Sequence, residues 1–374
     1  MRISCLQETL NKGLGIVGRA VATRSPLPIT QNILFQTDQG QLKLSATNLE
    51  VAITTWIGGK VEEEGSLTIP ARLLTEFVGS LPNERVDMTA TVQPRSLQLS
   101  CARFEARIIG TDAEEFPPIP TVVEDLTVQM DPKALRKAIG QVGFAAATED
   151  SRPVLTGVKL EMEDDRFTMA TADGFRLAVH SGKLIAPVSS PVSVIIPART
   201  LNELSRLLGD QEEPVNILLA PERGQVMFRL KNVEMVSQLI QGTFPNYSQL
   251  IPEAYATRAE LQVSDFLRAA RTAAIFARDG SGIVRLHVQP GSPGVLQVQA
   301  RVEEVGENVA ELDAAVEGGE AKVAFNSKYL QDVLGVMDTE TVALELTTPS
   351  SPGVLRPVAS DDYVHVVMPM FVQW

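Results

Sequence analysis

The sequence has 374 residues, a formal charge of −13 and an isoelectric point near 4.9, which argues against nucleic-acid binding through the whole surface. A length of 374 residues allows two or three domains, and Cys5 and Cys101 are too few for a disulfide framework or a metal-ligand spacing. No apolar run could span a bilayer, and residues 1–5 lack the apolar core of a signal peptide. We therefore expect a soluble, cytoplasmic protein.

The first part of the chain alternates short strands with two helices. A strand is predicted over residues 2–6, and the stripe of Leu10, Leu14, Val17 and Val21 predicts a helix over 7–24 that ends before two prolines. A second helix is predicted over 70–79, and further strands over 33–36, 42–47, 51–56, 86–92, 97–100 and 104–109.

The rest of the chain repeats this order. Asp131 and Pro132 are typical of a helix start, and Asp173 with Gly174 is typical of a hairpin turn between two alternating strands. Ser264 is the predicted N-cap of a third-repeat helix. The helices are predicted over 131–145, 197–208, 263–278 and 326–337. Predominantly antiparallel sheets with two helices in each repeat give an α+β fold.

Landmarks recur in one order, at four spacings of 125 to 129 residues. They are Asn48 and Asp173, Ile69–Arg72 and Ile196–Arg199 with a weaker copy at Phe325–Lys328, and Phe116-Pro117 and Phe244-Pro245. Copies of this length are whole domains, so we predict three, over 1–125, 126–254 and 255–374. Short joints that contain proline should hold the domains in a fixed order.

Catalytic motifs are weak in this sequence. Residues 13–18 fit the GxGxxG pattern and leave open an NAD-dependent enzyme, but a helical stripe runs through the glycines. The three histidines fall in predicted strands, and two carboxylate clusters, 62–64 and 161–165, fall at predicted turns. We expect neither a cofactor, nor a metal, nor an enzyme activity.

Two other features indicate binding. The predicted helices sum to +7, leaving −20 for the remainder, so helices that lined one surface would make it suitable for nonspecific phosphate contact. Near the end of the chain, Met368 and Met370 suit a groove for variable short peptides, since methionine adapts to different partners. Ordinary surface charge and a last core strand are the alternatives, and a repeat-built β scaffold that binds only proteins remains open.

The combination of the repeated Ile-Pro-Ala-Arg, residues 172–178, Phe244–Tyr247, Phe325-Asn326 with Tyr329, and the closing residues 363–370 resembles the bacterial sliding clamp family, the DNA polymerase III beta subunits. The resemblance covers the whole chain. It implies three clamp domains, a head-to-tail homodimer closed into a ring, and double-stranded DNA held without sequence specificity. Implied partners are the replicative DNA polymerase, the clamp loader, repair polymerases and other proteins that carry a clamp-binding peptide; the activity is that of a DNA polymerase processivity factor.

The resemblance also implies three sets of site residues. The DNA-facing candidates are Arg24 and Arg152, the strongest matches, with Lys12, Arg136, Lys137, Arg199 and Arg268. The candidates for the peptide cleft are Leu155, Gly174, Phe175, Arg176, Leu177, Pro245, Leu250, Tyr329, Val367, Met368, Pro369 and Met370. The candidates for the dimer interface are Phe104 in an edge strand, and Ile275 and Phe276 near a helix end.

Three departures from the family pattern bear on these sites. Phe175 stands where many relatives have histidine, and the chain closes on residues 371–374 instead of soon after a basic residue. Both fall in the cleft, so its peptide preference should differ. Glu149, an acidic residue near Arg152, should weaken a DNA contact there.

Overall fold

The computed structural model describes residues 1–122, 126–149, 151–209, 211–278, 282–302 and 306–373, so residue 125, the predicted end of the first domain, lies outside it. The chain divides into two compact units, Met1–Pro132 with Glu203–Leu239, and Lys133–Asn202 with Ile240–Trp374. The strand pairings in the described residues are antiparallel. None of the described helices is long and apolar enough to cross a membrane.

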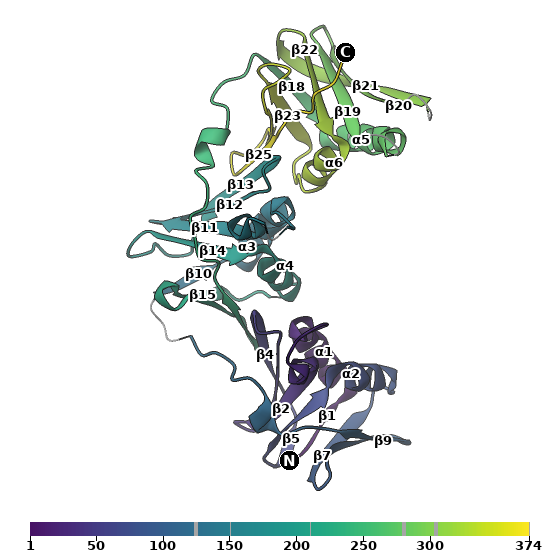
Figure 1. The fold of residues 1–374 in the computed structure, drawn as a ribbon, viewed down its shortest axis with the longest axis vertical. Helices are drawn as coiled ribbons and strands as arrows, with labels where there is room; N and C mark the ends of the chain where they lie inside the picture. The colour runs from purple at the N-terminus through teal and green to yellow at the C-terminus, as the bar shows by residue number, and fades with distance from the viewer. Residues whose placement is uncertain (123–125, 150, 210, 279–281, 303–305, 374) are drawn as a thin grey trace. The chain divides into compact units, whose positions relative to one another are not determined.

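The first unit contains a five-stranded sheet, ordered β5-β1-β7-β8-β9, that belongs to the first repeat. Its strands are β1 (Arg2–Leu6), β5 (Lys60–Glu63), β7 (Arg85–Val92), β8 (Arg95–Cys101) and β9 (Phe104–Ile109). Strand β9 is an edge strand, as the sequence predicted. The helices of this repeat are α1 (Gln7–Val17) and α2 (Ala71–Ser80), which pack against each other (Figure 1).

An eight-stranded sheet of the same unit crosses from the first repeat to the second. Its order is β10-β15-β16-β17-β4-β3-β2-β6. The strands are β2 (Asn32–Asp38), β3 (Gln41–Thr47), β4 (Val51–Ile57), β6 (Ser66–Pro70), β10 (Leu126–Met130), β15 (Val215–Ala220), β16 (Gln225–Arg229) and β17 (Val233–Gln238). Strand β17 pairs with β4 from Val233–Thr55 to Ser237–Val51, so the two repeats are joined by backbone hydrogen bonds.

The second unit contains a twelve-stranded sheet that crosses from the second repeat to the third, ordered β14-β11-β12-β13-β25-β24-β23-β18-β21-β20-β19-β22. Its first four strands are β11 (Gly157–Glu163), β12 (Arg166–Ala172), β13 (Arg176–Lys183) and β14 (Val192–Pro197). The third repeat supplies β18 (Thr257–Gln262), β19 (Ile283–Gln289), β20 (Gly294–Val302), β21 (Gly306–Gly318), β22 (Ala321–Asn326), β23 (Thr341–Leu346), β24 (Gly353–Pro357) and β25 (Tyr363–Val367). Strands β13 and β25 form the joint between the repeats.

The remaining helices follow the predicted pattern of two per repeat. Helices α3 (Pro132–Val142) and α4 (Ala198–Leu207) belong to the second repeat, and α5 (Val263–Ala277) and α6 (Ser327–Gly335) belong to the third. Helices α5 and α6 lie side by side (Figure 1). The apolar stripe of α1, which contains Leu10, Leu14 and Val17, is buried, because one apolar helix face covers one apolar sheet face. The α+β prediction is confirmed.

Two local predictions were wrong. The helix predicted over residues 7–24 ends at Val17, and only a short 3-10 helix, Gly18–Ala20, follows. Gly18 closes the helix, and Val21 is already extended, so its apolar side chain reflects packing outside the helix. Ser264 is not the N-cap of α5, because Gln262 takes that position without a side-chain hydrogen bond.

Candidate functional site

The turn between β12 and β13 is held by its own side chain. One carboxylate oxygen of Asp173 accepts hydrogen bonds from the backbone N–H groups of Phe175 (2.8 Å) and Arg176 (3.0 Å). Gly174 has a φ of +94°, which favours glycine. The carbonyl of Phe175 accepts from the backbone N–H of Met368 at 2.8 Å. This hairpin therefore presents Phe175 at a defined place beside the residue that follows β25.

An apolar surface lies around this turn. Its buried part includes Leu155, Leu177 and Phe244, with Tyr247 and Ile251 packed against them. Three large apolar side chains next to this cluster are exposed: Phe175 (58%), Leu250 (51%) and Met368 (44%). A buried apolar floor with an exposed apolar rim suits the anchors of a short peptide. We call these residues the cleft.

The structure brings together most of the predicted cleft residues. Arg176 pairs with Val367 across β13 and β25, and its guanidinium lies over the ring of Tyr329. Phe244, which precedes Pro245, belongs to the buried cluster. Tyr247, three residues before Leu250, packs against that cluster. Met370 turns toward β22, where its N–H donates to the carbonyl of Ala324 at 2.8 Å. Phe371 is exposed, and Trp374 lies outside the described residues.

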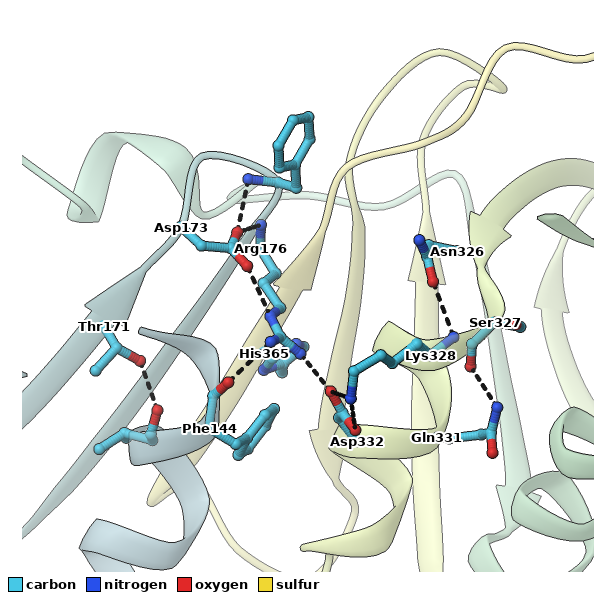
Figure 2. Close-up of polar contacts among 12 residues, drawn as sticks. Phe144, Thr171, Asp173, Arg176, Asn326, Ser327, Lys328, Gln331, Asp332 and His365 are labelled. Atoms are coloured by element: carbon cyan, nitrogen blue, oxygen red, sulfur yellow. Dashed lines mark hydrogen bonds and ion pairs between the residues drawn. The ribbon is translucent and has the colours of Figure 1, made fainter. Parts of the chain in front are cut away.

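Arg176 points into the protein instead of toward the cleft. Its guanidinium donates to Asp173 (2.9 Å), Asp332 (2.7 Å) and the carbonyl of Phe144 (2.8 Å), as Figure 2 shows. Only 9% of the residue is exposed. The prediction from the sequence placed Arg176 in the cleft, but it did not include Phe144 or Asp332. For Asp332 a signal existed, since it lies three residues after Tyr329 on the same helical face.

His365 lies next to this cluster and is fully buried in β25. Its Nδ1 is 3.1 Å from the hydroxyl of Tyr363, and its ring stacks on Phe144 at 5.5 Å between centroids. Burial, with a smaller contribution from the positive charge of Arg176, lowers the pKa of His365 to about 3. The imidazole is therefore neutral at physiological pH.

A second polar group of the same unit involves Lys137, a predicted DNA-facing residue. Its ammonium group lies 2.9 Å from Asp338 and 2.7 Å from Asp362. Burial alone would raise the pKa of Asp362, but hydrogen bonds from Lys137 and Ser360 hold that pKa below its usual value. Lys137 thus ties α3 to the segments that follow α6 and precede β25.

The other predicted DNA-facing residues are exposed, and they occur in both units. Lys12 is on α1, Arg136 on α3, Arg199 on α4 and Arg268 on α5, while Arg24 follows the 3-10 helix at residues 18–20. Arg152 is different, because its guanidinium lies against the turn, 3.1 Å from where a side chain on Gly174 would begin. The structure places Arg152 beside the Gly174 turn, and Glu149, close to it in sequence, is exposed.

The predicted dimer-interface residues are also accessible. Phe104 begins the edge strand β9, and its side chain is 52% exposed; Ile275 on α5 is 62% exposed and Phe276 is half-buried. Strand β21 lies next to α5, and its two parts have different partners. Residues 306–314 pair with β20, and residues 315–318 pair with β18. Helix α5, including Arg268, lines a hollow of about 550 Å³ together with residues 261–262 and residues 310–313 of β21.

The alternative enzyme site finds no support in the geometry. Gly13 and Gly15 lie inside α1 and Gly18 just after it, not in a turn between a parallel strand and a helix start. Across the described ranges no three His, Cys, Asp or Glu side chains gather as metal ligands would. Two histidines pair with a neighbouring side chain, His180 with Gln141 and His287 with Glu320.

This architecture matches that of known proteins. Models of the N-terminal, central and C-terminal domains of the DNA polymerase III beta subunit match residues 1–120, 129–246 and 248–371. The beta sliding clamps of Staphylococcus aureus and Synechococcus elongatus are each 30% identical to the chain, over 94% and 99% of both sequences.

Solved structures agree with these matches. The DNA polymerase sliding clamp of Bacillus subtilis has a TM-score of 0.94 at 27% identity, and the DNA polymerase III beta subunit of Pseudomonas aeruginosa 0.92 at 30%; each comparison covers both chains completely. The resemblance drawn from the repeats and the closing residues is confirmed. The chain therefore belongs to the DNA polymerase III beta subunit family, the family of the bacterial beta sliding clamps.

Proposed function

We propose that two copies of this chain close head to tail into a ring around duplex DNA and tether the replicative polymerase and other partners to it. The role is topological, so the chain needs no catalytic residue, and it acts in the cytoplasm where the chromosome is copied. Partners dock through the cleft around Phe175, Leu250 and Met368. The observation that carries the proposal is the way in which the repeats join.

Both joints within the chain use equivalent strands. The third strand after the first helix of a repeat, β4 or β13, pairs with the last strand of the next repeat, β17 or β25. The fifth residue of the former faces the first residue of the latter in both joints, Thr55 with Val233 and His180 with Tyr363. Among the described residues, the equivalent strands without such a partner are β9, the last strand of the first repeat, and the first half of β21.

A third joint between two chains follows from this equivalence. In the same register Phe104 would face Ala310 of the other copy, and Arg107 would face Glu307. The free half of β21 carries three acids, Glu307, Glu311 and Asp313. Opposite charges facing each other across an antiparallel pair favour that register and partner. Because each copy has one strand of each kind, two contacts close a ring.

The test reverses these charges. Arg107→Glu should raise the dissociation constant of the dimer by about 10- to 100-fold, since like charges would then face each other, and Glu307→Arg in the same chain should restore the dimer. Sedimentation measures the dimer. Arg166→Glu, at an exposed position in β12, is the control. Monomers of the parent chain at micromolar concentration, or no effect of either reversal, would contradict the ring.

Encirclement of DNA by the ring can be measured in a separate experiment. After loading by a clamp loader onto nicked circular DNA, the parent chain should stay on the circle and leave when the DNA is linearised. The exposed cations Arg24, Lys12, Arg136, Arg199 and Arg268 would make diffuse phosphate contacts, which carry no sequence information and permit sliding. Equal retention on circular and linear DNA would instead favour a scaffold that binds surfaces.

A further inference from the structure

The guanidinium of Arg176 connects two repeats at the cleft. On one side it bonds to Asp173 of the β12–β13 turn, and on the other to Asp332 of helix α6, with Nη1 to Oδ2 at 2.7 Å (Figure 2). Aromatic rings from both repeats flank it, Phe144 at 5.3 Å and Tyr329 at 4.5 Å from the guanidinium carbon. Each of its three nitrogens therefore donates to a protein group, and two aromatic rings lie close to it.

The turn that Arg176 holds is the one that displays Phe175. Asp173 binds the guanidinium with one carboxylate oxygen and the backbone N–H of Phe175 with the other, so the side-chain and backbone contacts share one group. The carbonyl of Phe175 in turn fixes Met368. The spacing of the two exposed side chains, Phe175 and Met368, depends on the orientation of Asp173.

Helix α6 provides the fixed point. Asp332 lies one turn after Tyr329 on α6, and Asn326 caps the helix by accepting from the N–H of Lys328 at 2.9 Å. Asp332 is also bound by Lys328 at 3.1 Å, but that lysine is 72% exposed in its side chain. A bidentate or stacked guanidinium sets direction as well as charge, which an exposed ammonium does not.

We propose that Arg176 is a positioning residue for the peptide cleft, and that its ion pair with Asp332 fixes the Phe175 turn against helix α6 before a peptide arrives. The inference rests on the proposed peptide-binding function. Preorganisation of this kind increases affinity because a binding partner need not order the turn. The buried guanidinium itself touches no peptide.

The test measures binding of a fluorescein-labelled decapeptide with one glutamine followed by leucine and phenylalanine anchors. Asp332→Asn should weaken its affinity about tenfold, mainly through faster dissociation, while the dimer persists. Arg176→Lys should behave alike, because an ammonium cannot bind both carboxylates and the Phe144 carbonyl from between two rings. Lys328→Ala, which removes the other cation on Asp332, is the matched control and should leave affinity within about twofold.

A role in positioning also predicts non-additivity. Phe175→Ala should cost less affinity in the Asp332→Asn background than in the parent, because an unfixed aromatic side chain contributes less. Affinity within twofold of the parent for Asp332→Asn, or strict additivity of the two changes, would overturn the inference.

Failure of the proposed function is recognisable separately. If the parent chain does not bind the probe, the peptide cleft is wrong, and hydrogen exchange of the Phe175 amide still decides the positioning role. That amide donates to Asp173, so it should exchange faster in Asp332→Asn than in Lys328→Ala. Equal exchange in the two variants would contradict the role of Arg176.

Discussion

The two joints within the chain begin with turns of the same hydrogen-bonding pattern, and they differ at the residue that begins the next strand. In the first repeat Asn48 accepts from the N–H groups of Glu50 and Val51, as Asp173 does for Phe175 and Arg176. Leu49 has a φ of +77°, close to that of Gly174. The strand that follows begins with Val51 in the first joint and with Arg176 in the second.

This difference suggests that the first joint only holds two repeats together, whereas the second joint also presents the cleft. The first joint relies on backbone pairing and on contacts such as Thr55 Oγ1 to the carbonyl of Asn232 at 2.9 Å, with the partly exposed pair Arg19–Glu203 nearby. The second adds a buried cation shared by two carboxylates. Buried ion pairs add little net stability but require one arrangement. We infer that the second joint carries its charges because it must present the cleft in one shape.

The largest effect should come from making the second joint like the first. Arg176→Val leaves Asp173 and Asp332 without their buried cation, so the free energy of unfolding should fall by about 3–5 kcal/mol. Urea unfolding measures it. The double variant Arg176→Val with Asp332→Leu should recover much of the loss, because one of the two carboxylates goes as well. A single variant as stable as the parent would show that the joints do not differ in this way.

An intermediate effect should appear with pH. Because the folded pKa of His365 lies near 3 and the unfolded value near 6.5, the unfolded chain binds a proton that the native chain excludes as pH falls below 6.5. Between pH 7 and pH 5 this costs about 2 kcal/mol of stability. His365→Phe, which keeps a ring beside Phe144, should lose that part of the acid sensitivity. Parallel pH profiles for the parent and the variant would contradict the shift.

The smallest effect belongs to the first joint. Arg19→Ala removes an ion pair whose side chains are about one-third exposed, and such pairs contribute about 0–1 kcal/mol. The substitution should therefore change the urea midpoint little. Added salt should shift the midpoint of the variant less than it shifts the midpoint of the parent, because the variant has no ion pair there to screen. A loss near that of Arg176→Val would mean that charge supports both joints equally.

Much of the fold could be predicted from local signals. Asp173 and Gly174 specify a turn by their own side-chain and backbone chemistry, and α1 follows its leucine stripe as far as Val17. The end of that helix could not be read, because Val21 continues the apolar period after the helical backbone has stopped. An apolar side chain can be buried from a helix or from an extended segment.

The directions of the side chains at the candidate site could not be predicted. The resemblance gathered Phe175, Arg176 and Met368, yet a sequence does not say which of two neighbouring side chains turns inward. Asp332 lies 156 residues from Arg176, and Asp362 lies 225 from Lys137. Pairings over such distances depend on the sheet that joins the repeats. The boundaries of the three domains remain predictions.

In the proposed ring, the free edges of β9 and of the first half of β21 also determine how copies of the chain assemble. A chain with one complementary edge of each kind could polymerise, and in this proposal only closure of the ring at two copies prevents open filaments. A copy altered at β9 alone would keep a working β21, so it would join a normal copy at one contact and leave the other open. A small share of such copies would act as chain terminators, converting closed assemblies into ones that release their DNA.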